Sequence, residues 1–342
     1  MKTETFAFGT TKDNLAVKGF RILNSNSISI SVINWGATLI SVQTPNRSGT
    51  CEEITLGFDN FNDYESYSLF FGSTVGRVAN RIKEGRFKIG NRVFNLERND
   101  SGVNHLHGGK QGFNNRIWDL DVKTGHDEAS LVCHYLSIDG ESGYPGNLST
   151  TVKYTLTEKN ELIFDYRAET DQLCPVNLTN HTYWNLSGNR RDCVLGHIMQ
   201  LFCDQYLPVD TSLIPTGEMK PVADTPWDFR KAKTIGAEID LAGGYDHCYV
   251  INQKQPGIRQ AALVFDPESG REMSVSTTTP GIQFYSGNFL GKLQDQGFKK
   301  HDGFCLETQG FPDAVNKKNF PSILLPPGEV YKQRTIHSFT IR

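Results

Sequence analysis

The chain has 342 residues, 37% hydrophobic and 21% charged, so its composition is that of a globular protein rather than a disordered one. The formal net charge at pH 7 is −3 and no block of like charges occurs, which argues against nucleic acid or a charged membrane surface as a partner. No apolar run approaches the ~18 residues of a membrane helix, and the first residues lack the apolar segment of an export signal. We therefore expect a cytoplasmic protein.

The seven cysteines are scattered, odd in number and without a C-x-x-C pair. This pattern is typical of neither a disulfide framework nor a zinc ribbon. We expect each to be a small buried hydrophobic residue. The positions are Cys51, Cys133, Cys174, Cys193, Cys203, Cys248 and Cys305.

The first clear strand and hairpin signals lie in the first half of the chain. Segment 26–34, NSISISVIN, alternates β-branched residues with serines and predicts a strand with one buried face. Segment 86–96, RFKIGNRVFNL, has two alternating arms around Gly90 and Asn91, which suits a two-residue type II′ hairpin turn. Segments 148–156 and 161–169 flank the polar TEKN and predict a second hairpin.

Most of the remaining pattern is also typical of β-structure. No long segment has a helical period, although 58–66, FDNFNDYES, predicts a short helix. Neither an internal repeat nor a low-complexity linker divides the chain. We therefore expect one large antiparallel β domain spanning 1–342. Further strands are predicted at 130–137, 197–202, 271–279 and 281–287.

Three histidines have a context that suggests function. PVNLTNHTYWNLSG, at 175–188, surrounds His181 with asparagines, threonines and two aromatic residues. His107 precedes two glycines in a turn-forming loop, and His247 follows Asp246 after a glycine pair. Imidazole is the side chain whose ordinary pKa lies closest to neutral pH. Taken singly, each histidine has the alternative of a satisfied structural residue.

Other polar side chains stand in apolar segments. Arg77 and Arg81 lie in GRVANRI, where each either pairs with a carboxylate or offers its donors to a ligand. Gln283 lies on a predicted strand and points opposite to its apolar neighbours. Glu307 follows an apolar run, where burial would raise its pKa and make it a better base. The alternative for each is a structural ion pair or an exposed edge position.

The sequence resembles the aldose 1-epimerases, or galactose mutarotases, over nearly its whole length. The resemblance implies an all-β fold, a large antiparallel β supersandwich, which agrees with the strand pattern. Trp184 stands where the family commonly has phenylalanine, which we expect to alter packing but not the chemistry. The motifs are INWGATLISV, LGFDNFNDY, TVGRVANRI, HLHGG, GYPGNL, PVNLTNHTYWNL, YLPVDTSLIPTGE, GYDH, GIQFYSGNFL, CLETQGFPDAVN and LLPPGEVY.

The resemblance implies an isomerase that interconverts the α and β anomers of free hexoses such as D-galactose and D-glucose. The sugar ring is a hemiacetal that opens to the aldehyde, rotates about C1–C2 and closes on the other face. Opening needs a base at the C1 hydroxyl and an acid at the ring oxygen, and their roles reverse on closure. By resemblance, Glu307 is the base and His181 the acid, with pKa values near working pH. The kcat should then fall in acid as the carboxylate protonates and in alkali as imidazolium is lost.

The resemblance also implies a set of sugar-binding side chains, and it implies no cofactor and no metal. Unmatched donors and acceptors in such a set are costly, which lets the site select hydroxyl stereochemistry. We expect the polar neighbours of His181 to hold its ring, and Tyr183 or Trp184 to pack near the sugar. We further expect an aldose as the partner and a monomer rather than a dimer. The binding residues are Asn80, Arg81, His107, Tyr183, Asp246 and Gln283.

Alternatives remain open at this point. His105 and His107 would place two imidazoles on one face of a strand, as in a metal enzyme of cupin type. A non-catalytic sugar-binding module would keep the fold, although both His181 and Glu307 are present. A hexose 6-phosphate epimerase would need a basic phosphate pocket, and only Arg81 among the proposed residues is basic.

Overall fold

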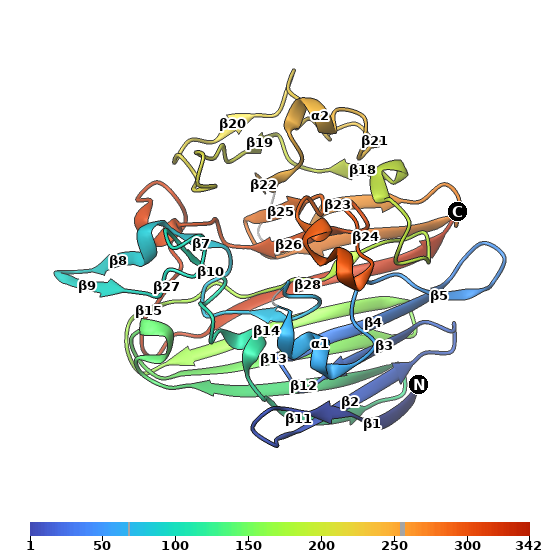
Figure 1. Ribbon diagram of the computed structural model, residues 1–342, viewed down its shortest axis with the longest axis horizontal. Helices are drawn as coiled ribbons and strands as arrows, with labels where there is room; N and C mark the ends of the chain where they lie inside the picture. The colour runs from blue at the N-terminus through green and yellow to red at the C-terminus, as the bar shows by residue number, and fades with distance from the viewer. Residues whose placement is uncertain (68, 254–256) are drawn as a thin grey trace.

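The computed structural model describes residues 1–67, 69–253 and 257–342. Within these residues the strands form three large antiparallel sheets and four two-stranded ones (Figure 1). The α-helices are short, and α1 (Phe61–Ser66) confirms the helix predicted at 58–66. No helix of the described part is long and apolar enough to cross a membrane. The other helical elements are α2 (Ile239–Ala242), η1 (Lys83–Gly85), η2 (Phe113–Asn115), η3 (Glu141–Gly143), η4 (Val194–Gly196), η5 (Leu290–Gln296) and η6 (Ala314–Asn316).

The largest sheet has nine strands in the order β11-β12-β13-β14-β28-β24-β23-β18-β21. It contains the strands predicted at 130–137, 148–156, 161–169, 197–202 and 271–279, and the second predicted hairpin is its β13–β14 pair. The bounds are β11 (Asp119–Thr124), β12 (Glu128–Ser137), β13 (Leu148–Thr157), β14 (Glu161–Thr170), β28 (Tyr331–Ile341), β24 (Arg271–Thr277), β23 (Arg259–Phe265), β18 (Ile198–Leu201) and β21 (Lys233–Thr234).

The N-terminal segment forms a five-stranded sheet in chain order. Its third strand confirms the strand predicted at 26–34, but the serine face is buried as well as the apolar face. The Ser29 hydroxyl accepts a hydrogen bond from Arg21 and lies 3.4 Å from the Gln43 amide oxygen, so long side chains of the neighbouring strands cover it. The strands are β1 (Lys2–Thr10), β2 (Ala16–Leu23), β3 (Ser29–Ile33), β4 (Thr38–Pro45) and β5 (Cys51–Glu53).

The third large sheet has six strands in the order β17-β26-β25-β22-β19-β20. Every residue of β25 and β26 is buried, so this sheet is covered on both faces at these two strands. It includes the strand predicted at 281–287. The strands are β17 (Tyr183–Trp184), β26 (Phe304–Gln309), β25 (Gly281–Tyr285), β22 (Asp246–Val250), β19 (Gln205–Tyr206) and β20 (Lys220–Pro221).

Four short strand pairs complete the sheets. The predicted hairpin around Gly90 is the β8–β9 pair, and its turn glycine has the positive φ, +57°, that a type II′ turn requires. The other pairs join segments far apart in the chain. They are β6 (Thr74–Val75) with β16 (Thr179–Asn180), β7 (Arg81–Ile82) with β10 (His105–Leu106), β8 (Arg86–Ile89) with β9 (Arg92–Asn95), and β15 (Cys174–Pro175) with β27 (Leu324–Leu325).

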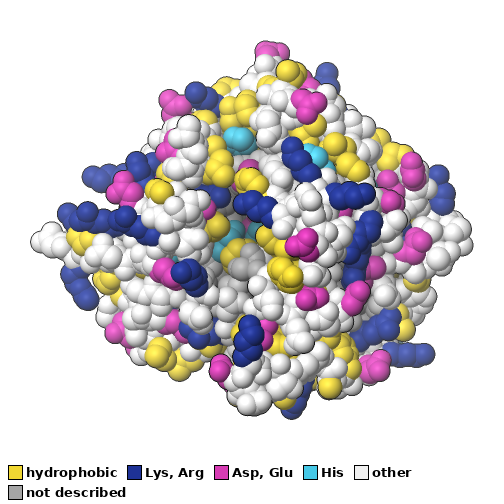
Figure 2. Space-filling model, viewed as in Figure 1, with side chains coloured by type: hydrophobic (Ala, Val, Ile, Leu, Met, Phe, Trp, Pro, Cys, Tyr) yellow, Lys and Arg dark blue, Asp and Glu magenta, His cyan; other side chains and the backbone are white. Residues whose placement is uncertain are grey.

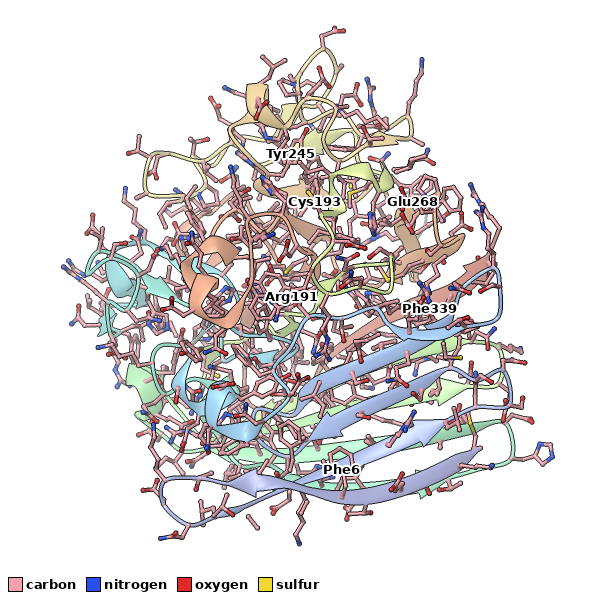
Figure 3. The ribbon with its side chains drawn as sticks, turned by 45° about the vertical axis from the view of Figure 1, so that its right-hand side comes forward. Phe6, Arg191, Cys193, Tyr245, Glu268 and Phe339 are labelled. Atoms are coloured by element: carbon pink, nitrogen blue, oxygen red, sulfur yellow. The ribbon has the colours of Figure 1, made fainter. Side chains whose placement is uncertain are left out.

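One main hydrophobic core joins the three large sheets. It contains Val42 of the five-stranded sheet, Phe164 of the nine-stranded sheet and Phe284 of the six-stranded sheet. Phe339 of β28, labelled in Figure 3, belongs to the same core. The cysteine prediction is wrong at two positions, because Cys51 and Cys193 are exposed while the other five are buried. All seven are free thiols.

Candidate active site

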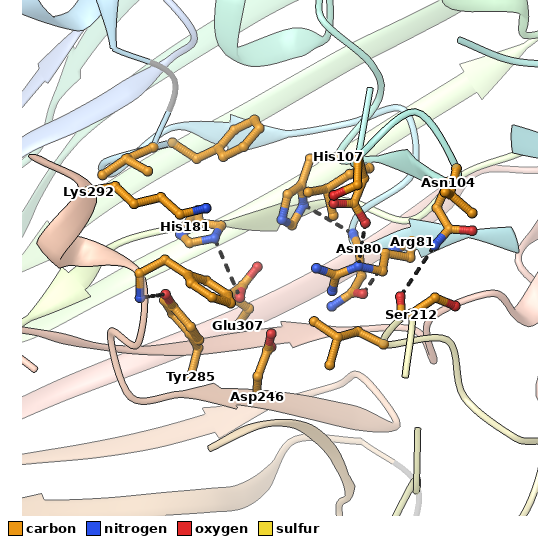
Figure 4. A pocket seen from close by; sticks show the side chains of 18 of the residues that line it. Asn80, Arg81, Asn104, His107, His181, Ser212, Asp246, Tyr285, Lys292 and Glu307 are labelled. Carbon is orange, nitrogen blue, oxygen red and sulfur yellow. Dashed lines mark hydrogen bonds and ion pairs between the residues drawn. The ribbon is translucent and has the colours of Figure 1, made fainter. Parts of the chain in front are cut away.

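A cavity of about 590 Å³ lies where the six-stranded sheet meets loops from the first third of the chain (Figure 4). Figure 2 shows a hollow in this face with histidine side chains inside it and basic side chains nearby. The volume is within the range of small-molecule sites. Seven of the eight predicted site residues line it: Asn80, Arg81, His107, His181, Tyr183, Asp246 and Glu307.

The strand register brings His181 and Glu307 together. β17 pairs with β26 so that Tyr183 lies opposite Cys305. His181 lies two residues before Tyr183, where its backbone pairs with Gly72 and Ser73, and Glu307 lies two residues after Cys305 on β26. His181 Nε2 lies 3.8 Å from Glu307 Oε1, and the two side chains are only 7% and 3% exposed. A carboxyl and an imidazole therefore face each other on the wall of the cavity.

Burial moves the two pKa values in opposite directions. Burial, with the nearby charge of Asp246 adding to it and that of Arg81 opposing it, raises the pKa of Glu307 to about 8. Burial lowers the pKa of His181 to about 4. The values lie on either side of neutrality rather than both near it. At neutral pH the pair therefore holds one proton, which rests on Glu307 in the protein alone.

His107 is held by the backbone of Asn80. β7 pairs with β10, and just beyond this pair the Asn80 N–H donates to His107 Nδ1 at 3.1 Å. The backbone N–H of His107 donates in return to the backbone carbonyl of Asn80, also at 3.1 Å. Burial, with smaller contributions from His181 and Arg81, lowers the pKa of His107 well below its ordinary value, so its ring is neutral. Because Nδ1 accepts a hydrogen bond, the ring proton lies on Nε2 and makes this nitrogen a donor.

The same tautomer bears on metal binding. His107, His181 and Glu307 offer ligand atoms within 4.8 Å of one another, the composition of a two-histidine, one-carboxylate site. A histidine ligand must present an unprotonated nitrogen, but the Asn80 amide occupies Nδ1 of His107 and leaves the proton on Nε2. This donor set therefore fits a metal ion poorly.

The predicted alternative pair of His105 and His107 is not on one face of a strand. β10 ends at Leu106, and His107 has a φ of +52°. His105 Nδ1 donates to the Glu97 carbonyl at 2.7 Å, and its Nε2 accepts from the Tyr144 hydroxyl at 2.8 Å. Both nitrogens of His105 are thus satisfied by the protein, which leaves neither for a ligand.

Arg81 is both an ion-pair partner and a cavity residue. Its Nε donates to Asp100 Oδ2 at 2.8 Å, while no hydrogen bond joins its Nη groups to another residue in the described part of the chain. Arg77, by contrast, is 2% exposed and donates to the carbonyls of Ser137, Ile138 and Pro145. Of the two arginines, only Arg81 has donors left for a ligand.

Gln283 differs from the other predicted binding residues, because it is not among the residues that line the cavity. Its Nε2 donates to Asp246 Oδ1 at 2.6 Å, so it orients a carboxylate that does line the cavity. Burial raises the pKa of Asp246, and Arg81 and Gln283 oppose the shift. Gln283 Oε1 and Glu307 Oε2 are buried acceptors without a hydrogen-bond partner in the described part of the chain. Direct contact of Gln283 with a sugar stays a prediction.

The polar residues near His181 do not hold its ring as we expected. Asn180 donates to the Gly72 carbonyl and Thr179 to the Thr308 carbonyl, so these side chains brace the backbone. Among the described residues, the one hydrogen bond of the ring joins Nδ1 and Cys305 Sγ at 3.6 Å. Short polar side chains favour such local backbone hydrogen bonds.

Two aromatic rings stack on the His181 ring instead. Tyr183 lies at 5.1 Å between ring centroids and Phe70 at 5.7 Å. Trp184 lies in the main core, stacked at 5.0 Å on His337, and is not a cavity residue. Of the two aromatic residues predicted to pack near the sugar, only Tyr183 lines the cavity.

Several cavity residues were missed by the sequence reasoning. Lys292 lies on η5, and Phe289 is the residue directly before this helix. Residues 211–213 form a turn on the other side of the cavity opening (Figure 4). Phe70 has no pattern that would have marked it, whereas Phe289 and the turn at 211–213 lie inside motifs quoted above. His247 does not line the cavity. Its Nδ1 accepts a hydrogen bond from the Trp227 indole at 3.2 Å.

Several known proteins are similar to this chain over nearly its whole length. A family model described as aldose 1-epimerase matches residues 19–338. Galactose mutarotase from Bos taurus is 42% identical over 325 residues, 93% of each chain. Aldose 1-epimerase from Escherichia coli (strain K12) is 38% identical over 328 residues, 92% of this chain and 93% of that protein. The crystal structure of galactose 1-epimerase from Lactobacillus acidophilus NCFM has a TM-score of 0.87 at 31% identity and covers 99% of both chains. On these matches over nearly its full length, the chain belongs to the aldose 1-epimerase family.

Proposed function

We propose that this chain interconverts the α and β anomers of free hexoses such as D-galactose and D-glucose. The observation that carries the proposal is the buried Glu307–His181 pair, whose side chains lie 3.8 Å apart on the wall of the cavity. The C1 hydroxyl and the ring oxygen of an aldose are bonded to the same carbon. Two adjacent protein groups can therefore serve both oxygens at once.

In this mechanism Glu307 removes the proton of the C1 hydroxyl while His181 protonates the ring oxygen. The C1–O5 bond breaks and the aldehyde forms at C1. After rotation about C1–C2, His181 takes back the O5 proton as O5 attacks C1, and Glu307 returns a proton to the carbonyl oxygen. Hydroxyl donors of the bound sugar favour the ionised form of Glu307, which moves the shared proton toward His181.

The remaining polar groups of the cavity suit a polyhydroxylated ligand. His107 Nε2 and the Nη groups of Arg81 are donors, and Asp246 is an acceptor. Glu307 Oε2, a cavity group without a hydrogen-bond partner among the described residues, would be satisfied by a sugar hydroxyl. We propose that these groups, with Asn80 and Tyr183, hold the sugar without a metal or cofactor.

We also propose that residues 1–342 act as one catalytic domain, as a monomer in the cytoplasm. The family match over 19–338 supports a single functional unit. Seven free thiols are typical of a reducing compartment. Size-exclusion chromatography with light scattering tests the oligomeric state.

The test of the activity is polarimetry on freshly dissolved α-D-galactose and α-D-glucose. The protein should accelerate the approach to the equilibrium rotation, and an unchanged rate would refute the proposal. A hexose 6-phosphate epimerase is the second candidate, because Lys292 supplies a basic side chain in the cavity besides Arg81. A preference for the 6-phosphates over the free hexoses in the same assay would favour it.

A further inference from the structure

The imidazole of His181 is stacked against two aromatic rings, and its one hydrogen bond among the described residues is to the weakly bonding thiol of Cys305. Tyr183 stacks on it with an interplanar angle of 30°, and Phe70 with an angle of 25° at 5.7 Å. Phe70 also contacts His107, with ring centroids 4.7 Å apart. One half-buried phenylalanine therefore touches both imidazoles of the site, on the side where it lines the cavity.

The segment that carries Phe70 is tied to the backbone of His181. The Gly72 N–H donates to the His181 carbonyl, and the His181 N–H donates to the Ser73 carbonyl, both at 3.0 Å. The Asn180 amide adds a hydrogen bond to the Gly72 carbonyl at 2.7 Å. The backbone segments that carry the Phe70 and His181 rings thus belong to one hydrogen-bonded unit.

Phe70 adopts an unfavourable backbone conformation to reach this position. Its φ is +58°, in the left-handed region that bulky residues rarely occupy. Such a residue persists only where the surroundings over-determine it, and such positions cluster at functional sites. The local backbone would accept glycine or asparagine more easily, so the aromatic ring itself is the feature to be explained.

We propose that Phe70 is a positioning residue for the reaction: with Tyr183 it clamps the His181 ring so that Nε2 points at Glu307 and the sugar, and it keeps water off the imidazole face. The inference rests on the proposed function and deepens it. A misaligned acid costs rate steeply, because proton transfer requires hydrogen-bond geometry in the transition state. The clamp also supplies apolar surface for the burial that lowers the pKa of His181.

The test variant is Phe70→Asn, because asparagine tolerates the left-handed backbone and removes the ring. We expect kcat to fall at least about tenfold while KM changes by less than about threefold. Phe70→Tyr keeps the aromatic face and should recover most of the rate. Phe94→Asn removes a half-buried phenylalanine on the distant β8–β9 hairpin and should leave kcat unchanged.

A second measurement does not depend on turnover. The other titratable groups that face the His181 ring are Glu307, His107, Cys305 and Tyr183, with Asp246, Arg81 and Lys292 further along the wall. In protein with ¹⁵N-labelled histidine, the His181 signals, identified by their loss in His181→Ala, should titrate at higher pH in Phe70→Asn than in wild type.

The outcomes separate the possible roles of Phe70. A raised KM with unchanged kcat and unchanged titration of His181 would make Phe70 a sugar platform and overturn the inference. Equal kinetics of Phe70→Asn and Phe94→Asn would overturn it too. If wild type lacks mutarotase activity, the proposed function fails, whereas the titration still tests the clamp.

Discussion

Two histidines, His181 and His337, have similar surroundings but different neighbours. Each is about 5% exposed and stacked on an aromatic ring, and burial lowers the pKa of each, to about 4 and about 3. His181 faces a carboxyl whose pKa is raised and opens on the cavity. His337 lies on β28 with both ring nitrogens unpartnered among the described residues, against Trp184 and Phe164.

The difference shows that a depressed imidazole pKa does not by itself mark an active site. Burial alone produces the shift at both positions. What distinguishes His181 is a second group shifted in the opposite direction within reach of the same substrate atoms, the arrangement that acid–base chemistry needs. Substitutions at or near either histidine test this difference.

The largest expected effect is on the proton-transfer pair. Glu307→Gln keeps shape without a base, and His181→Ala removes the acid, so each should lower kcat at least about a hundredfold. The double variant should be little worse than the poorer single one, because ring opening fails when either proton cannot move. Polarimetric kcat on proteins with unchanged circular dichroism checks this. Near wild-type kcat in Glu307→Gln would make Asp246 the next candidate base.

Arg81→Ala should have the next largest effect. Loss of charge-assisted donors to sugar hydroxyls typically costs about 1.5–3 kcal/mol, so kcat/KM should fall about tenfold to a hundredfold. Asp100→Asn is the matched control, since it weakens the ion pair of Arg81 without removing its Nη donors. If both variants lose the same activity, or if Arg81→Ala loses none, Arg81 is a structural ion-pair residue.

The pH profile of kcat/KM, which reports the pKa values of the protein without bound sugar, should be bell-shaped with limbs near pH 4 and pH 8. Below about pH 4 the pair gains a second proton on His181, and above about pH 8 it loses its only proton from Glu307. The acid limb is thus assigned to His181 and the alkaline limb to Glu307, the reverse of the expectation from the sequence, because burial holds the carboxyl protonated and the imidazole neutral. The profile should be measured from pH 3.5 to 9.5, and a flat alkaline side would contradict the raised pKa of Glu307.

His337→Leu should leave kcat within about twofold but change acid stability. The folded state disfavours protonation of His337, so wild-type stability is present above pH 6.5 and is lost as pH falls toward 3. Each unit of pKa difference is worth about 1.4 kcal/mol, and pH 4.5 lies about two units below the ordinary pKa of histidine, so His337 should account for roughly 2 to 3 kcal/mol of the loss between pH 7 and pH 4.5. Urea unfolding at both pH values should show a smaller pH dependence in the variant. An equal pH dependence would mean that His337 is hydrated in the folded protein.

Removal of metal ions by a chelator should have the smallest effect on the enzymatic activity. Activity should be unchanged after dialysis against EDTA, because the hydrogen bond from Asn80 gives His107 the wrong tautomer for a ligand. Added Zn²⁺ in stoichiometric amounts should not raise the rate of the chelated protein. A loss of activity restored by one particular metal would contradict this expectation.

Strands and the two local hairpins could be predicted from period-two patterns and turn residues, but pairings between segments far apart in the chain could not. His181 and Glu307 come together next to the β17–β26 pair, which joins segments far apart in the chain, and no local pattern records that register. The prediction that the polar neighbours of His181 hold its ring is wrong for a physical reason, because short polar side chains tend to form hydrogen bonds with nearby backbone groups. Phe70 could not be predicted at all, because phenylalanine carries no sequence signal for a left-handed φ.

The walls of the cavity come from segments near residues 70–107, 181–183, 211–213, 246 and 285–307, and no single hairpin carries both proton-transfer groups. During refolding, local hairpins such as β13–β14 can form early, because closing a short loop costs little entropy. The cavity exists only when the longest loops have closed. Recovery of anomer exchange should therefore report the final docking of the chain. A protease cut between β7 and β26 that lets the two pieces separate should abolish turnover.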